Sequence, residues 1–505
     1  MVAIPLRSGA YSSQSYIANA QRAINIYSEK NPEETGAPFP VTQYVRPGLK
    51  LLNNPPNLAQ GRCLYRSTNG YLFAVIAQNV YYIDQNYNFT QIGALASNRT
   101  TPAYMADNGT TAFLVDGSPQ GYMITLPTST APIPAMNQTA DPNFLGSDRV
   151  DFIDSFLIFN KPGTNEWYCT QSGSTTFNAL FIGVKTAWPD PIQCVVAVER
   201  VVYVFGPQKS EAWYNAGTVP FPFQIQPGVI IEQGCVAKYS PQKMDVNVYW
   251  LSESPEGARI VMRGNQQLVA QRISTHAIEY EFLKYGRVDD AIGSVYQVSG
   301  HSFYELHFPT ADKTWTFDAA TGQWFEDNWI DSNGKLHRAR NTFTAYAYNL
   351  NMALDWSTGQ LYQIDPYTLT DNGTPIVWIR SFPHFEQELK RVFLSSVTAD
   401  VDTGSSLNTG QTGQFLSPWS LGFNSGFGPL TQVQSPVVTL RLSRNGGTRY
   451  DNNRPLSYIG SGNYRSLMRW RGCGYSRDWV VELSSTAEMS GALNGVYVDV
   501  IPGVT

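Results

Sequence analysis

The amino-acid sequence predicts an all-β protein that contains a β-propeller, and three observations support this. Charged residues make up only 15% of the 505 residues, whereas aromatic residues reach 13%. The chain also contains 41 glycines and 31 prolines, residue types that form turns. This composition suits short strands joined by tight turns and argues against an all-helical or disordered chain. The third observation is an internal repeat.

The repeat has a period of about 40 to 50 residues, the length of a four-stranded propeller blade. Seven times, an apolar run is followed by a turn and a second segment that carries aromatic residues. The seven apolar runs are Tyr71–Ala77, Thr111–Val115, Phe156–Phe159, Val201–Phe205, Val246–Leu251, Ser302–Phe308 and Met352–Trp356.

These runs are apolar almost throughout, a pattern typical of strands that are buried on both faces. Propeller blades pack face to face around an axis, so their inner strands are buried in this way. A pair of β-sandwiches would also produce many short strands. Seven similar hairpins in succession favour the propeller, with six or seven blades, because the first or last unit can be shared or incomplete.

Two segments have a helical pattern. Ser274 and Thr275 precede the sequence HAIEYEFLKYG, which predicts a capped short helix that ends at Gly286. A second short helix is expected within the N-terminal arm, where the apolar spacing is that of Ile17, Ala20, Ile24 and Tyr27.

The sequence divides into three regions. Residues 1–55 form an N-terminal arm and the strand that leads into the propeller, residues 56–384 form the propeller, and residues 385–505 form a C-terminal β-sandwich. The sandwich strands are expected at Arg391–Asp402, Val437–Leu442, Arg465–Arg471, Trp479–Leu483 and Val496–Ile501. This last region also carries eight arginines between Arg441 and Arg477.

A Gly/Ser-rich loop at 403–435 interrupts the sandwich. Its aromatic residues either pack against their own domain or become ordered on a partner subunit, and the sequence leaves both interpretations open. These aromatic residues are Phe415, Trp419, Phe423 and Phe427.

The charge and the cysteines limit the class of protein. A net charge of −5 argues against a protein that wraps nucleic acid by neutralising phosphates. The sequence has no apolar stretch long enough for a transmembrane helix, and its first residues lack the pattern of a signal peptide. The five cysteines are dispersed without CxxC spacing, so we expect reduced, buried thiols: Cys63, Cys169, Cys194, Cys235 and Cys473.

No catalytic, cofactor-binding or metal-binding residues are predicted, because the sequence lacks the recognised catalytic and nucleotide-binding motifs. Asp400 and Asp402 begin like a calcium loop but lack its later oxygen ligands. Ser443-Arg-Asn445-Gly-Gly447 resembles the Asp-box turn of sialidase-type propellers, which is a structural turn. Paired carboxylates for glycoside hydrolysis have no fixed spacing and stay an open alternative. Structural roles are expected for the five histidines: His276, His301, His307, His337 and His384.

Three blocks of sequence resemble one phage family. The central block is Ile273–Glu326, in which the matching positions include Gly300-His301, Thr314-Trp315 and Phe317-Asp318. The outer blocks are Ala20–Lys30 followed by Arg46-Pro47-Gly48-Leu49, and Leu440–Leu483. The chain therefore resembles the packaged-DNA stabilisation proteins, also called tail nozzle or tail hub proteins, of short-tailed bacteriophages. The loop at 403–435 has no match in this family.

The resemblance implies a structural virion protein without catalysis or cofactors. Members of this phage family form a six-fold ring below the portal and the adaptor, continue the DNA channel and hold the packaged genome. The implied partners are other copies of the chain, the adaptor ring, a tail needle or plug, tailspikes or fibres, and DNA that passes without sequence-specific binding. The implied location is the phage tail, assembled in the host cytoplasm. The alternative is a glycan-binding or glycan-cleaving propeller, which would have an aromatic and carboxylate pocket on its axis.

Overall fold

The protein folds into two compact units. The structure, a computed structural model, describes residues 2–6, 9–32, 39–254, 256–386, 390–402, 437–457, 465–486 and 492–502. One unit is Leu49–Ile364, and the other combines Met1–Gly48 with Asp365–Thr505. The first unit is a β-propeller and the second a β-sandwich, so the predicted fold class is confirmed.

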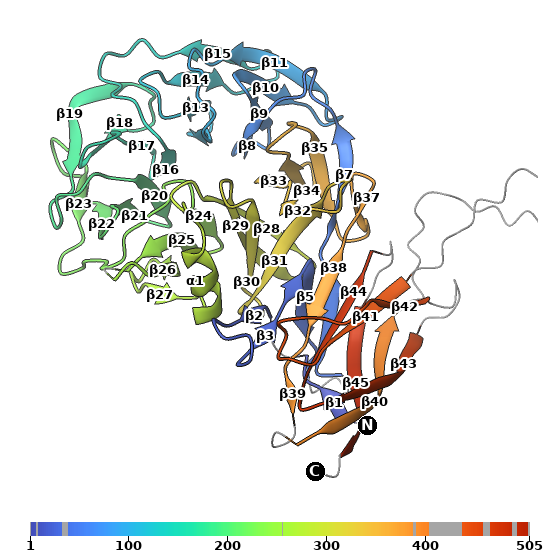
Figure 1. The fold of residues 1–505 in the computed structure, drawn as a ribbon. Coiled ribbons are helices and arrows are strands. Elements are labelled where there is room, and N and C mark those ends of the chain that lie inside the picture. Colours follow the sequence, from blue (N-terminus) through green and yellow to red (C-terminus); the bar gives the residue numbers. More distant parts are fainter. Residues whose placement is uncertain are drawn as a thin grey trace, which may run out of the picture. The chain divides into compact units, whose positions relative to one another are not determined.

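The described part of Leu49–Ile364 contains seven blades of four antiparallel strands (Figure 1). Six blades use consecutive strands. Blade one contains β8 (Gly61–Arg66), β9 (Leu72–Ile76), β10 (Asn79–Ile83) and β11 (Phe89–Ala94). Blade two contains β12 (Tyr104–Asp107), β13 (Thr111–Val115), β14 (Tyr122–Thr125) and β15 (Ala135–Gln138). Blade three contains β16 (Val150–Ile153), β17 (Phe156–Asn160), β18 (Glu166–Thr170) and β19 (Phe177–Val184).

The next three blades continue in the same order. Blade four contains β20 (Cys194–Val198), β21 (Val201–Phe205), β22 (Ser210–Asn215) and β23 (Phe223–Ile225). Blade five contains β24 (Gln242–Met244), β25 (Asn247–Glu253), β26 (Arg259–Asn265) and β27 (Gln271–Arg272). Blade six contains β28 (Ile292–Val298), β29 (His301–Phe308), β30 (Lys313–Asp318) and β31 (Gln323–Ile330), and β32 (Leu336–Arg338) pairs with β31.

The seventh blade closes the ring with a strand from near the N-terminus. It contains β33 (Phe343–Ala347), β34 (Leu350–Leu354), β35 (Leu361–Asp365) and, as its fourth strand, β7 (Gly48–Asn53). The predicted range of six or seven blades therefore resolves to seven, with the last blade shared between two distant segments.

The seven apolar runs are the second strands of the blades and so are inner strands, as the sequence pattern indicated. The first strands β8, β12, β16, β20, β24, β28 and β33 surround the axis (Figure 1). The second strands are more apolar because other blades cover both of their faces, whereas the first strands also carry polar side chains such as Asp151 and Lys243.

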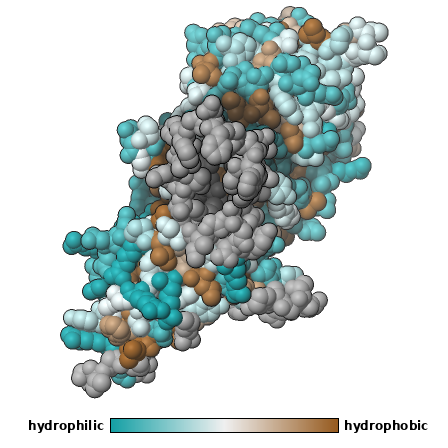
Figure 2. Space-filling view, turned by 90° about the vertical axis from the view of Figure 1, so that its right-hand side faces the viewer, coloured by the Kyte–Doolittle hydropathy of each residue, from teal (hydrophilic) through white to brown (hydrophobic). Residues whose placement is uncertain are grey.

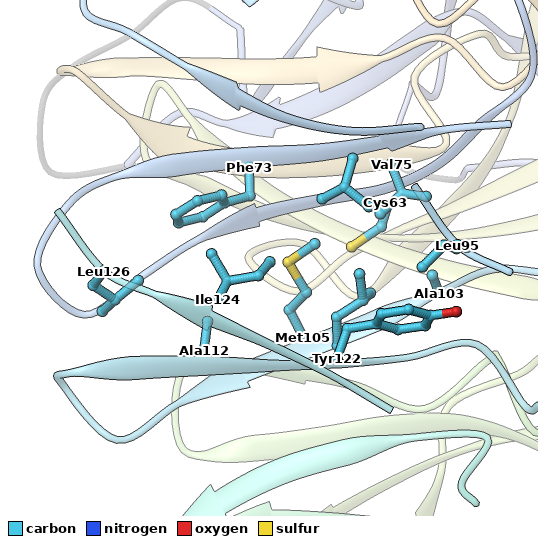
Figure 3. Packing of buried hydrophobic residues seen from close by; sticks show 12 residues of the cluster. Cys63, Phe73, Val75, Leu95, Ala103, Met105, Ala112, Tyr122, Ile124 and Leu126 are labelled. Carbon is cyan, nitrogen blue, oxygen red and sulfur yellow. The ribbon is translucent and has the colours of Figure 1, made fainter. Parts of the chain in front are cut away.

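The blades are held together by apolar clusters between neighbours. Between blades one and two, Phe73 and Val75 of β9 face Met105, Tyr122 and Ile124 of the next blade (Figure 3). Similar clusters lie between blades two and three, three and four, and four and five. Blades seven and one share a further cluster, which completes the ring. Burial of these apolar faces is the main force that holds the blades together.

The predicted helix is present as α1 (His276–Leu283). The Thr275 side chain caps it by accepting a hydrogen bond from the Ile278 amide, and Ser274 donates to Glu279 within the first turn. The Thr275 contact satisfies a backbone amide at the helix N-terminus, as the sequence pattern predicted.

The second unit is a sandwich whose strands come from both ends of the chain. One sheet has the order β43-β40-β45-β6-β5, with β1 paired to β45. The other contains β4-β38-β44-β41-β42, with β39 paired to β44. The N-terminal strands of the second unit are β1 (Val2–Ile4), β2 (Tyr11–Ser12), β3 (Ala20–Gln21), β4 (Ala23–Ile24), β5 (Ile26–Lys30) and β6 (Val41–Val45).

The remaining strands of this unit follow the propeller in sequence. They are β36 (Thr370–Asp371), β37 (Thr374–Pro375), β38 (Trp378–Ser381), β39 (Phe385–Glu386), β40 (Val392–Asp402), β41 (Val437–Ser443), β42 (Arg454–Ser457), β43 (Arg465–Ser476), β44 (Asp478–Ser485) and β45 (Ala492–Pro502). The five predicted strands of the C-terminal region are all present. The loop at 403–435, with its four aromatic residues, lies outside the described residues.

Two expectations for the N-terminal arm differ from the structure. The helix expected around Ile17 and Ile24 is wrong, because β3, β4 and β5 occupy that segment and pair with other strands. The domain boundaries at 55/56 and 384/385 also differ from the two units. The arm belongs to the sandwich, because β5 pairs with β6 and β6 with β45, and β38 and β39 pair with β44 in the same unit.

The exposed surface is polar although few residues are charged. On the face in Figure 2, apolar residues are scattered among predominantly hydrophilic ones.

The five cysteines are free and buried, as expected. Burial raises the pKa of the Cys63 thiol to about 12, so this thiol stays protonated at neutral pH.

Candidate functional site at the propeller axis

The axis of the propeller is filled by side chains that connect blades which are not neighbours. Arg149, at the start of blade three, donates from Nη1 to the Pro241 carbonyl of blade five at 2.6 Å. Lys243 of β24 pairs with Asp151 of β16 at 2.8 Å. These contacts cross the axis between blades three and five, and so they occupy its centre.

Aromatic residues also form contacts across the axis. The Tyr104 hydroxyl of β12 donates to the Tyr239 carbonyl at 3.2 Å, and the two rings stack. The Arg149 guanidinium lies 4.5 Å from the centre of the Tyr104 ring. Burial raises the pKa of Tyr104 well above its usual value, so its hydroxyl remains a donor at neutral pH. These interactions bridge blades two, three and five across the axis of the propeller.

A cavity lies at each end of the closed axis. One, of about 440 Å³, is lined by the later residues of the first strands β24, β28 and β33, including Asp245 and Tyr296. The other, of about 560 Å³, lies where the first strands begin. We call the second one the axial cavity. Its lining is Gln60, Gly61, Thr100, Thr101, Pro102, Gln193, Val236, Lys238, Tyr239, Arg287, Asp289, Asp290, Ile292, Pro309, Arg338, Phe343 and Trp356.

Two cations of the axial cavity are already paired with carboxylates. Arg287 donates to both oxygens of Asp289, at 2.6 and 3.0 Å. Lys238 contacts Asp148 at 2.7 Å. Burial disfavours the ammonium of Lys238, but Tyr239 and Asp148 outweigh this effect and raise its pKa. Neither cation contributes an unbalanced charge to the cavity.

Arg338 is different, because it is 94% buried and stacks on an aromatic ring. Its guanidinium lies 3.6 Å from the centre of the Trp356 ring. Burial lowers the pKa of Arg338 to about 10, against the opposing effect of Asp312, so the guanidinium remains charged at neutral pH. A cation–π contact of this kind stabilises the charge but uses none of the N–H donors.

Four residues of the lining each carry a buried polar atom without a hydrogen-bond partner. These atoms are Nη1 of Arg338, Nε1 of Trp356, Oδ1 of Asp290 and Oγ1 of Thr101. Buried polar atoms are normally paired, because an unpaired one costs about 1–3 kcal/mol. The four residues come from three blades and lie far apart in sequence, which explains why no motif in the sequence indicated the axial cavity. The aromatic and carboxylate pocket expected for a glycan-binding propeller corresponds in position and composition to this cavity.

The histidines lie close to carboxylates. His301 and Asp318 join β29 to β30 at 2.9 Å. Trp315 of β30 donates to the Tyr285 hydroxyl. The other histidines lie near Glu279, Glu305, Asp312 and Asp478. No group of three or more potential metal ligands occurs among the residues that the structure describes.

The C-terminal motifs have structural roles where they are described. Asp400 is buried and accepts from Nε of Arg465 at 2.9 Å, so this carboxylate forms an ion pair with an arginine. Ser443 accepts from the Gly447 amide, which forms the glycine-rich turn after β41. A polar cavity of about 690 Å³ in this unit is lined by Arg444, Asn445, Arg449, Tyr450, Asp451, Asn452 and Arg454.

The described residues include no helix that is both long and apolar enough to span a membrane.

The fold and the axis define a class of protein: a seven-bladed β-propeller with a closed axis, joined to a sandwich made from both chain ends. A family model described as "Bacteriophage P22 Gp10, beta-propeller" matches residues 2–369. The chain belongs to this family and is a structural protein of a bacteriophage.

Solved structures of other proteins are distant. A streptogramin B lyase is 8% identical, with a TM-score of 0.38, and covers 62% of this chain and 97% of its own. BamB from Moraxella catarrhalis is 10% identical, with a TM-score of 0.35, and covers 62% of this chain and 99% of its own. No curated protein matches the sequence.

Proposed function

We propose that the chain is a subunit of the tail nozzle ring, which extends the DNA channel below the portal and the adaptor. The ring retains the packaged genome and conducts it during ejection. The observation that carries this proposal is the family match over residues 2–369, together with the resemblance of the central and outer sequence blocks to tail nozzle proteins. The proposal includes a role without catalysis in the virion, after assembly in the host cytoplasm.

The closed axis supports a channel that is shared by several subunits. Arg149, Lys243 and Tyr104 occupy the axis of the single propeller, so DNA has no path through it. A DNA channel built from this chain therefore has to lie between copies, as in a closed ring with cyclic symmetry. Six copies are the number that the resemblance implies.

The charge supports passage of DNA without tight binding. The whole chain carries a net charge of −5. A channel lined by acidic and neutral residues repels phosphate and lets the duplex slide. A channel lined mainly by lysine and arginine would contradict this part of the proposal. The partners that we propose are the adaptor ring, a needle or plug at the far end, and tailspikes or fibres.

Single-particle electron microscopy of the purified chain, with and without its adaptor ring, tests the proposal. We expect a six-fold ring with a central channel wide enough for a DNA duplex. The charge of the channel lining can be read from the same reconstruction. A chain that stays monomeric in the presence of the adaptor would overturn the nozzle function.

A further inference from the structure

We propose that the axial cavity is a binding site for a neutral, hydroxyl-rich ligand, a short segment of a neutral polysaccharide. The site goes beyond the proposed structural function and does not depend on ring formation. Its volume of about 560 Å³ falls within the roughly 300–1,000 Å³ of small-molecule sites. The argument rests on the open hydrogen-bonding groups of the lining and on its charge balance.

The open groups include both donors and an acceptor. Arg338 Nη1 and Trp356 Nε1 are donors, Asp290 Oδ1 is an acceptor, and Thr101 Oγ1 can act as either. The other oxygen of Asp290 already accepts from the amide and the hydroxyl of Thr310, which fixes the carboxylate. These four atoms are buried within lining residues, so each would contact a ligand in the cavity only after a rotation of its side chain.

The charge balance favours a neutral ligand. Arg287 and Lys238 are paired with Asp289 and Asp148, and Arg338 is balanced by Asp290 on the same lining. An anion would meet the open carboxylate oxygen, and a cation would meet the open guanidinium. A hydroxyl group can accept from Arg338 or Trp356 and donate to Asp290, so a sugar satisfies both kinds of group at once.

The lining also has the apolar surface that a sugar ring needs. Phe343 and Tyr239 line the same cavity as the polar groups. Sites for small ligands combine such aromatic walls with a few polar groups that fix orientation. A position at one end of a closed axis lets a ligand enter but not pass through.

Isothermal titration calorimetry with the full chain tests the site. The probes are neutral trisaccharides of glucose, galactose, mannose or N-acetylglucosamine, and the anionic probes are a glucuronic acid trisaccharide and inorganic phosphate. We expect saturable binding of at least one neutral trisaccharide. Trp356→Phe removes the Nε1 donor and keeps an aromatic ring at this position. Asp290→Asn replaces the carboxylate acceptor with a neutral amide. Each should weaken binding by about fivefold or more, the effect of one lost hydrogen bond.

Trp329→Phe is the matched control. Trp329 also has an unpartnered Nε1 and an arginine over its ring, Arg340 at 4.2 Å, but it does not line the axial cavity. The control should bind as the unchanged chain does. Circular dichroism verifies the fold of each variant. The proposal is overturned if no neutral trisaccharide binds, if only the anionic probes bind, or if Trp356→Phe and Trp329→Phe have equal effects.

Discussion

In the propeller, strands pair with strands that are close in sequence, whereas in the sandwich they pair across most of the chain. Leu72–Ile76 pairs with the strand that begins at Asn79, only a turn away. In the sandwich, Leu493 pairs with Gln43, and Arg380 with Ala23. One exception in the propeller is β7, which closes the seventh blade. The propeller thus consists of local units, and the sandwich needs both chain ends at once.

Both regions contain buried charge, and in the propeller Arg62 of β8 pairs with the buried Asp116 at 3.3 Å. Apolar clusters dominate between the blades. In the sandwich unit, the buried side chains of Arg46 and Asp371 form a two-pronged ion pair, with Nη2 to Oδ2 at 2.5 Å and Nη1 to Oδ1 at 3.1 Å. Both regions therefore combine apolar packing with specific polar contacts, and they differ in how far apart in sequence their paired strands lie.

Truncation should separate the two regions most clearly. Removal of residues 2–47 takes away β1–β6, so we expect hydrogen–deuterium exchange to increase throughout β40, β44 and β45 while β9, β13 and β17 stay protected. Removal of residues 2–53 also takes away β7 and should increase exchange in β33–β35. Continued protection of β40 and β45 after the shorter truncation would show that the sandwich does not need the N-terminal strands.

Substitution of one buried tryptophan in each region should reveal which strands it supports. Trp250 packs against Phe205 between blades four and five, and Trp479 donates to the Val392 carbonyl in the sandwich. We expect Trp250→Ala and Trp479→Ala each to lower the free energy of unfolding by about 3–5 kcal/mol. Exchange should increase mainly in the unit that carries the substitution. Trp188→Ala, at a site that is 40% exposed, is the control and should cost about 1 kcal/mol or less.

The buried ion pair tests the polar dependence of the sandwich unit. Asp371→Ala leaves the Arg46 guanidinium buried without its carboxylate and should lower the free energy of unfolding by about 3–5 kcal/mol. The double variant Arg46→Met, Asp371→Leu removes both charges and should be less destabilised than Asp371→Ala. Urea unfolding measures both. Equal losses in the two variants would show that the unpaired charge is not the cause.

The smallest effect concerns Lys185, a buried charge in the propeller. Burial lowers the pKa of Lys185 to about 8 from the ordinary 10.5, although Glu211 opposes this. Between these values the unfolded chain holds the proton and the folded chain does not, so the contribution of this group to stability rises with pH. Urea unfolding at about pH 7 and pH 9.5 should therefore show wild type gaining stability relative to Lys185→Met. A difference that stays constant would contradict the shifted pKa.

Much of the fold was predictable from sequence, because each blade repeats a local pattern. The apolar runs located the second strands, and the cap at Thr275 located α1. The arm was misread because Ile17, Ala20, Ile24 and Tyr27 have helical spacing, whereas pairing with distant strands determines their conformation. Tertiary context overrides local spacing in such segments.

The axial cavity was not predictable. Thr101, Asp290, Arg338 and Trp356 lie far apart in sequence, and none belongs to a motif. Only the expectation of a pocket on the axis, for a glycan-binding propeller, pointed to this place. Residues of these types occur in many places in proteins, so whether they form a binding site depends on which of them the blades bring together.

The sequence by itself determined the all-β class, the repeated blades, the capped helix and the resemblance to a phage family, because these depend on neighbouring residues. Tertiary structure alone decided that β7 closes the seventh blade, that the first 48 residues join the sandwich, and that Arg149, Lys243 and Tyr104 close the axis. The physical reason is distance along the chain. Local patterns record hydrogen bonding and burial within a turn or a hairpin, whereas contacts between remote segments form only when the whole chain folds.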